Sequence, residues 1–331
     1  DRTVFIWDVK DFKQKEHKSF RVNIEFDHST FVKWSPDNKA FLIHRDRDCN
    51  IEVYKVEKKK DGTLAHATAS HTFPKLHKEE VVGMAIACNG KFIMTCSKEN
   101  DLILWDLKGQ VLAKVDTCLL NTFCAKISPC GTFVIASGFA PDAKIWEVSF
   151  SKSGEFQDVK RAFELTGHSS GIYDVACNAD SSQMVTISKD GTWRLFDTKV
   201  EYKKRQDPRL LISGKYNNSG EKALVALSPN GVVVVGLKNA LQFFSAQTAV
   251  LDYTIDNIYD GVITRVVFDA SGRYLLTSGP RHILVFHNVT GYKCDIHSAE
   301  QKLKEHQTSA TKERLQQIIK DSQAFLNSIS K

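Results

Sequence analysis

The sequence predicts an all-β fold built from repeated four-stranded units, and three observations support this prediction. Short runs of alternating apolar and polar residues recur along most of the 331 residues. A tight turn of similar composition separates two of these runs six times. An aromatic residue closes each unit 13 to 16 residues after that turn, so the inner hairpins have nearly constant length.

The clearest unit runs from Gly167 to Asp197. Apolar and polar residues alternate over Ile172 to Cys177, Gln183 to Ile187 and Trp193 to Phe196, with turn-forming residues between them. This pattern predicts three strands. A fourth strand is expected directly before them, at Ala162 to Leu165.

The recurring turn ends on residues that accept a positive φ, which is the backbone conformation that closes a tight hairpin. These final turn residues are Asn38, Gly90, Gly131, Ser181, Gly231 and Gly272. The aromatic residues that close the units are Tyr54, Trp105, Trp146, Phe196, Phe244 and Phe286. Because the closing aromatics are 41 to 51 residues apart, the variation in length lies in the connections between units.

A Gly-His pair at the start of a unit and an aromatic-Asp pair at its end resemble one repeat of the WD-repeat β-propeller family. Six full repeats follow an isolated strand that ends at Trp7-Asp8. The resemblance therefore implies a seven-bladed propeller over residues 1–293, whose first repeat is truncated in this sequence. The last blade is expected to have three strands, to end near Val289 and to leave one edge exposed.

The pattern changes in residues 294–331, which are charged and rich in helix-forming residues. Ser298, followed three residues later by Gln301, has the spacing of a capping box and predicts the start of a single C-terminal helix. An apolar stripe runs along this segment through Leu315, Ile318, Ile319, Phe325, Leu326 and Ile329. Two interpretations stay open: a helix folded back on the propeller, or a short coiled coil with a partner.

His168, Ser188 and Asp190 are the candidate site residues, because Ser, His and Asp together invite interpretation as a hydrolase. Their positions match the structural hydrogen-bond network of the family that the repeats resemble. Phe196 stands where that network would have a tryptophan, so its indole donor is missing. No nucleophile elbow surrounds Ser188, and the phosphate-binding loop and the H-E-x-x-H motif are also missing. We expect a structural network, no cofactor and no enzyme activity.

Cysteine and charge patterns indicate the environment. The eight cysteines contain no C-x-x-C pair, which favours reducing, cytosol-facing surroundings, and Cys118, Cys124 and Cys130 lack partners at zinc-site spacing.

The net charge is +6. Three basic runs that could contact RNA phosphates lie between repeats, with acidic residues interleaved that favour solvated loops. One is Lys75-Leu76-His77-Lys78, and the other two are the candidate binding residues. They are Lys58, Lys59 and Lys60, and Lys203, Lys204 and Arg205.

The long connections at Lys55 to His77 and Thr198 to Glu221 are the expected binding surfaces, because they are polar and unequal in length. A rigid platform with variable connections predicts a protein-interaction scaffold. An RNA-binding propeller that uses the basic runs is the alternative.

Longer segments carry a narrower resemblance. GKFIMTCS (90–97), GEFQDVKRAFELTGHS (154–169) and VEYKKRQDP (200–208) resemble the transducin beta-like branch of the WD-repeat family. This resemblance implies a non-catalytic scaffold anchored in the endoplasmic reticulum membrane by an N-terminal segment missing from this sequence. It also implies a cytosolic propeller and a protein partner in stress signalling.

Overall fold

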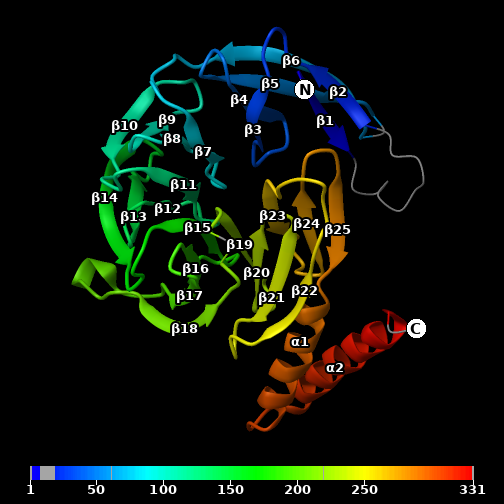
Figure 1. Ribbon diagram of the computed structural model, residues 1–331. Helices are drawn as coiled ribbons and strands as arrows, with labels where there is room; N and C mark the ends of the chain where they lie inside the picture. Colours follow the sequence, from blue (N-terminus) through cyan, green and yellow to red (C-terminus); the bar gives the residue numbers. More distant parts are fainter. Residues whose placement is uncertain (1, 8–18, 61, 219, 330–331) are drawn as a thin grey trace. The chain divides into compact units, whose positions relative to one another are not determined.

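The computed structural model describes residues 2–7, 19–60, 62–218 and 220–329, which form antiparallel sheets followed by two helices (Figure 1). Strands β1 (Thr3–Trp7) and β2 (Ser19–Asn23) form a two-stranded sheet. Strands β3 (Ser29–Trp34), β4 (Ala40–Arg45), β5 (Asn50–Lys58) and β6 (Leu64–Thr72) form the first four-stranded sheet. The second contains β7 (Val81–Ile86), β8 (Ile93–Ser97), β9 (Asp101–Trp105) and β10 (Val111–Asp116).

Three more four-stranded sheets follow in chain order. The first contains β11 (Thr122–Ile127), β12 (Phe133–Gly138), β13 (Ala143–Phe150) and β14 (Phe156–Leu165). The next contains β15 (Ile172–Cys177), β16 (Gln183–Ser188), β17 (Thr192–Asp197) and β18 (Arg209–Lys215). The third contains β19 (Ala223–Leu227), β20 (Val232–Leu237), β21 (Ala240–Ser245) and β22 (Leu251–Ile255). A three-stranded sheet of β23 (Arg265–Phe268), β24 (Tyr274–Ser278) and β25 (Ile283–His287) comes last.

The chain divides into two compact units. One comprises Asp1–Ala136 with Ile145–Arg161, and the other comprises Ser137–Lys144 with Ala162–Lys331. In each unit, alternate residues of neighbouring sheets pack against one another, as period-two strands require. In the first unit, Leu42 and Val53 lie in one cluster with Met84 and Ile103. In the second unit, one such cluster joins the β19–β22 sheet to the β23–β25 sheet.

The recurring hairpin turn has the predicted geometry. All six final turn residues have a positive φ, from 56° at Asn38 to 75° at Gly231. The backbone N–H of each donates to the carbonyl three residues earlier, for example Gly131 N to Ser128 O at 2.8 Å. Ser181 adopts φ 60° although it is neither glycine nor asparagine. The sequence prediction of these turns is therefore confirmed.

The all-β class and the propeller-type blades are confirmed, but the seven-bladed count is not. The described residues form six sheets of three or four strands, together with the two-stranded β1–β2 sheet. The prediction of a three-stranded last blade is correct, and β25 ends at His287. On this last sheet Ile283 and Val285 are about half exposed.

The single predicted C-terminal helix is wrong, because the segment folds into two helices. Helix α1 (Val289–Leu303) begins before Ser298, which lies inside it. Asn288 is the N-cap: its side chain accepts a hydrogen bond from Gly291 N and donates to Gly272 O at 2.8 Å. Because this cap depends on a carbonyl sixteen residues earlier, it had no signature within the helical segment.

Helix α2 (Ser309–Ile329) folds back on α1. Phe325 stacks on Tyr292 of α1 with ring centroids 4.2 Å apart, and it also contacts His287. Helix α1 in turn contacts β20 and β21. Apart from the exposed Ile329, the apolar stripe of α2 is thus at least partly buried within the second unit, as the folded-back interpretation describes.

The two long connections are less loop-like than predicted. Lys55 to His77 contains the end of β5 and all of β6, and Thr198 to Glu221 contains β18 and the 3-10 helix η2 (Tyr202–Lys204). The sequence does not indicate β6 and β18 as strands, because these polar outer strands lack the strict alternation of apolar and polar residues that a half-buried strand shows.

Candidate functional site

His168 lies in the connection between β14 and β15 and reaches across to β16 and the β16–β17 turn. Its Nδ1 is 2.9 Å from Asp190 Oδ2, and its Nε2 is 2.8 Å from Thr186 Oγ1. The imidazole side chain is fully buried. Both ring nitrogens therefore have side-chain partners.

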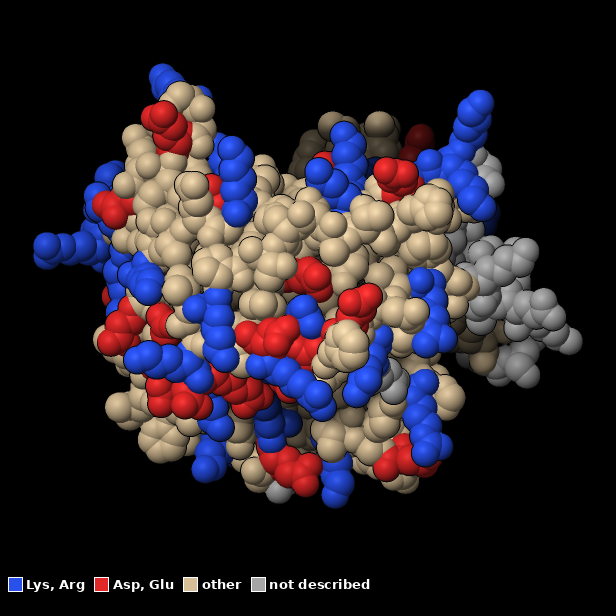
Figure 2. Space-filling view, turned by 90° about the horizontal axis from the view of Figure 1, so that it is seen from above, with Lys and Arg blue, Asp and Glu red and all other residues tan. Residues whose placement is uncertain are grey.

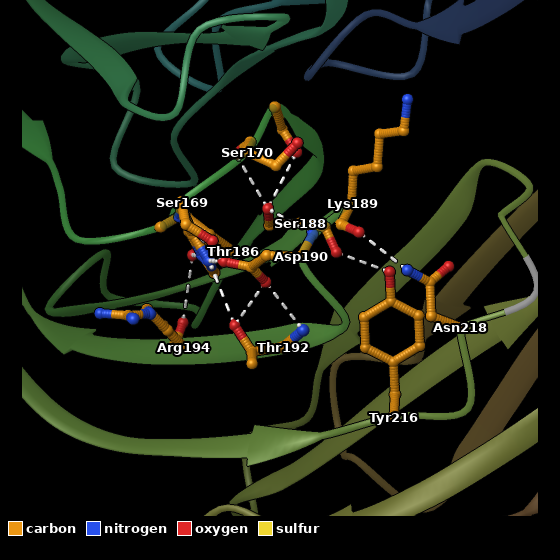
Figure 3. A network of polar contacts seen from close by, with 12 residues as sticks. Ser169, Ser170, Thr186, Ser188, Lys189, Asp190, Thr192, Arg194, Tyr216 and Asn218 are labelled. Carbon is orange, nitrogen blue, oxygen red and sulfur yellow. Dashed lines mark hydrogen bonds and ion pairs between the residues drawn. The ribbon is translucent and has the colours of Figure 1, made fainter.

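Asp190 collects several donors (Figure 3). Its carboxylate accepts hydrogen bonds from the Thr192 hydroxyl at 2.7 Å, from Thr192 N at 2.9 Å and from Ser169 N at 3.1 Å. Burial raises the pKa of Asp190, but the hydrogen bonds from Thr192, His168 and Ser169 outweigh it and lower the pKa to about 2. Burial lowers the pKa of His168. A neutral imidazole therefore donates from Nδ1 to the Asp190 carboxylate and accepts at Nε2 from Thr186.

Ser188 belongs to the same network but is not paired with His168. Its hydroxyl is fully buried and lies 2.9 Å from each of the Ser170 and Gly171 carbonyl oxygens, to which it donates. It also accepts a hydrogen bond from Asp190 N at 3.2 Å. In the part of the chain that the structure describes, no hydrogen bond joins Ser188 to His168. The three predicted residues come together, but without the nucleophile–base contact that hydrolysis needs.

Sequence reasoning missed Thr186 and Thr192. Thr186 takes the second nitrogen of His168, and Thr192 supplies two of the donors to Asp190. The signal that could have identified Thr186 is a threonine at the same position in the β7–β10 sheet. Thr95 there lies two residues before Ser97, as Thr186 lies two before Ser188.

The β7–β10 sheet contains the longer form of this network. Trp105 Nε1 donates to Thr95 Oγ1 at 2.8 Å, and Thr95 Oγ1 is 2.6 Å from His77 Nε2. His77 Nδ1 is 3.0 Å from Asp101 Oδ2. Phe196 in β17 and Trp105 in β9 occupy equivalent positions in their sheets. The strand register shows this, because each residue lies opposite the equivalent residue of the neighbouring strand. A phenyl ring has no N–H to donate to Thr186.

The two basic runs of candidate binding residues lie in different units. Lys58 ends β5, and Lys59 N donates to Thr63 O at 2.7 Å in the turn that leads to β6. Lys203 and Lys204 lie in η2, where Lys204 Nζ is 2.6 Å from Glu201 Oε2. Figure 2 shows Lys and Arg side chains interspersed with Asp and Glu over the lower half of the view. Lys58, Lys59 and Lys60 are exposed, whereas an ion pair with Glu201 partly neutralises the second run.

The described residues contain no group of three or more His, Cys, Asp or Glu side chains placed to hold a metal ion. Within the described residues, neither helix is both long enough and apolar enough to cross a membrane.

Comparison with known proteins identifies the family. The WD domain, G-beta repeat family matches residues 68–106 and 159–197. Transducin beta-like protein 2 of Homo sapiens is 41% identical over 332 residues, which cover 99% of this chain and 74% of that protein. The Mus musculus protein of the same name is 41% identical over 331 residues, covering 99% and 75%. Ribosome biogenesis protein ytm1 of Aspergillus clavatus is 24% identical over 183 residues, covering 54% and 36%.

The blade pattern and the His-Thr-Asp networks agree with these matches, and the identity extends over nearly the whole chain. The chain belongs to the transducin beta-like protein 2 family of WD-repeat proteins.

Proposed function

We propose that the protein is a non-catalytic protein-interaction scaffold. The observation that carries this proposal is that Ser188, His168 and Asp190 all form hydrogen bonds inside the fold. The Ser188 hydroxyl donates to backbone carbonyls, and the His168 ring is enclosed between Asp190 and Thr186. These groups hold the β14–β15 connection against the β16–β17 turn, which is a structural role. The WD-repeat fold itself is typically a platform for binding.

Family membership supports a finer proposal about where the scaffold acts. We infer a cytosol-facing protein that is held at the endoplasmic reticulum membrane by a segment outside this sequence and that binds a stress-signalling component there. The eight cysteines are all free thiols in the structure, which suits a reducing compartment.

Affinity purification with mass spectrometry tests the scaffold proposal. We expect a reproducible set of protein partners for the wild-type chain and for Ser188→Ala, once each is shown to be folded by circular dichroism. The proposal is wrong if no protein co-purifies above a folded unrelated WD-repeat control. A hydrolytic activity that disappears in Ser188→Ala at unchanged fold would also contradict it.

RNA binding is the second candidate, favoured by the similarity to a ribosome biogenesis protein over about half of the chain and by the basic runs. The ion pair between Lys204 and Glu201 reduces the charge that the second run presents. A salt titration of binding to a single-stranded RNA oligonucleotide decides. A steep fall of affinity with salt that is lost on replacing Lys203, Lys204 and Arg205 by Ala establishes this function. Salt-independent or undetectable binding would rule out RNA binding as a function.

A further inference from the structure

We propose that the outer edge of β6 binds an extended peptide segment by antiparallel strand addition. This inference rests on the proposed scaffold function and assigns it a surface and a class of partner. Strand β6 is the last strand of its sheet and pairs with β5 on one side. Within the described residues no backbone hydrogen bond from another strand or loop reaches Leu64–Thr72 on its other side. An edge of this kind presents unpaired N–H and C=O groups to a further strand.

Strand β6 differs from the outer strands of the other four-stranded sheets in having no charged residue. Its nine residues read LAHATASHT, and the lysines, arginines, carboxylates and prolines that normally protect an edge are missing. Strand β25, the edge of the three-stranded sheet, is also uncharged but presents the apolar Ile283 and Val285. The outer strands of the other four-stranded sheets, and β2, each carry at least one charge. These charges are Arg21 in β2, Lys114 and Asp116 in β10, Asp158, Lys160, Arg161 and Glu164 in β14, Arg209 and Lys215 in β18, and Asp252 in β22.

The exposed side chains of β6 are small. His66, Thr68, Ala69, Ser70 and Thr72 are exposed, and none of them is a large apolar residue. A partner strand could approach this edge without burying a charge.

Two register shifts divide the pairing of β5 with β6, one between Val53 and Tyr54 and one between Glu57 and Lys58. Register shifts also occur in the outer pairings of β10, β18 and β22, so they do not distinguish β6. Between the two shifts, β6 is regular from His66 to Ala69. This four-residue stretch is the centre of the proposed site.

A basic cluster at one end of the edge indicates the charge of the partner. Leu64 pairs with Lys58, and Lys59 and Lys60 follow in the β5–β6 turn. Glu57, opposite His66, and Asp61, which follows Lys60 in the sequence, are the acidic residues of this segment. The three lysines outnumber these two acidic residues, so the end of the edge beside Leu64 favours acidic side chains.

These features define the partner. It is an extended segment with small or β-branched uncharged residues over the β6 edge, followed by acidic residues. Antiparallel pairing, which β6 adopts with β5, places its C-terminal end beside Leu64. The acidic residues therefore lie at the C-terminal end of the bound segment.

The test uses three fluorescent peptides and the whole chain. The first is TVTVTVTEEE, the second is EEETVTVTVT, and the third is the first with alternate backbone nitrogens methylated. Fluorescence polarisation measures their affinity. We expect the first peptide to bind about tenfold more tightly than the second, because only its glutamates reach the lysine cluster in an antiparallel strand. The methylated peptide, with methyl groups on the nitrogens that face β6, is expected not to bind, because those N–H groups are the donors that strand addition uses.

Variants locate the site. Thr68→Lys places a charge in the middle of the edge and should weaken binding about tenfold. Replacing Lys58, Lys59 and Lys60 by Glu should abolish the preference for the first peptide. Thr254→Lys is the matched control, since Thr254 is an exposed threonine of another outer strand, β22, and should leave binding unchanged. Hydrogen exchange with the first peptide bound should slow in 64–72.

The inference is overturned if no peptide binds at millimolar concentration, if methylation has no effect, or if protection appears outside 64–72. The methylated peptide decides this even if Thr68→Lys does not fold. The outcome is separable from that of the scaffold proposal. Co-purifying partners that are retained in Thr68→Lys leave the scaffold in place and remove the β6 site. Specific peptide binding without any co-purifying protein would support the β6 site and contradict the scaffold proposal.

Discussion

Trp105 donates its indole N–H to the hydroxyl of Thr95 at 2.8 Å, and this bond extends a polar chain that also contains the buried His77 and the partly exposed Asp101. The β15–β18 sheet repeats the chain with Thr186, His168 and Asp190 but has Phe196 in place of the tryptophan. One protein thus contains the same network with and without its terminal donor. This pair allows the contribution of the indole to be measured within a single molecule.

Thr95→Val should destabilise the protein more than Thr186→Val. The first substitution leaves both the Trp105 N–H and the His77 Nε2 without their partner, whereas the second removes the partner of His168 Nε2 and a long contact of 3.5 Å to the Arg194 carbonyl. We expect a loss of about 1–3 kcal/mol for Thr186→Val and a larger loss for Thr95→Val in the free energy of unfolding. Urea denaturation measures both, with exposed Thr254→Val as the control. Equal losses would show that the indole bond contributes nothing.

Asp190→Ala should cost about 1–3 kcal/mol of unfolding free energy at pH 7, because buried donors lose their acceptor. The pKa of Asp190 is lowered from its ordinary 3.8 to about 2, so its carboxylate stabilises the fold above pH 4. That contribution is lost as the pH falls from about 4 to about 2. Denaturation curves at pH 5, 4 and 3 should therefore converge for wild type and Asp190→Asn. Curves that stay parallel would contradict the assignment.

His44 should make stability fall below neutral pH. It is buried in β4, with Nδ1 2.7 Å from Thr30 Oγ1, and burial together with the charge of His77 lowers its pKa to about 4. The unfolded chain binds a proton near pH 6.5 and the folded chain does so only near pH 4, so stability is lost as pH falls through this range.

Between pH 7 and pH 5 this difference amounts to about 2 kcal/mol. The variant His44→Leu should show a pH dependence smaller by that amount in guanidinium titrations. His66→Leu, a change at an exposed position of β6, is the matched control. An unchanged slope in His44→Leu would assign the pH dependence to other groups.

Phe325→Ala should release α2 from α1. The Phe325 ring stacks on Tyr292 and contacts His287, and an aromatic pair contributes about 0.5–1.5 kcal/mol beyond the apolar area it buries. Hydrogen exchange should become faster in Ser309–Ile329 and stay unchanged in the β15–β18 sheet. Ile329→Ala, at an exposed position of the same helix, should have little effect. Unfolding of the whole second unit in Phe325→Ala would mean that the helices are integral to the sheets.

Local sequence determined the strands and turns of the inner hairpins. The predicted run Ile172 to Cys177 coincides with β15, and the positive φ at Asn38 and Gly131 follows from residues that accept it. These features depend on neighbouring residues and on period-two burial, both of which can be read along the chain. His168 and Asp190 were also identified in this way, through the repeat in which they occur.

Tertiary structure decided what distant residues do to one another. Thr186 joins the network because strand pairing brings it beside His168, eighteen positions away in the chain. Helix α1 begins at Val289 because Asn288 binds the Gly272 carbonyl, a partner outside the helical segment. The outer strand β6 was hidden because its polar, exposed residues have no buried face to impose alternation. In each case the deciding free energy comes from a contact between residues that are far apart in the chain. The sequence contains both partners, but local patterns do not show that they are in contact.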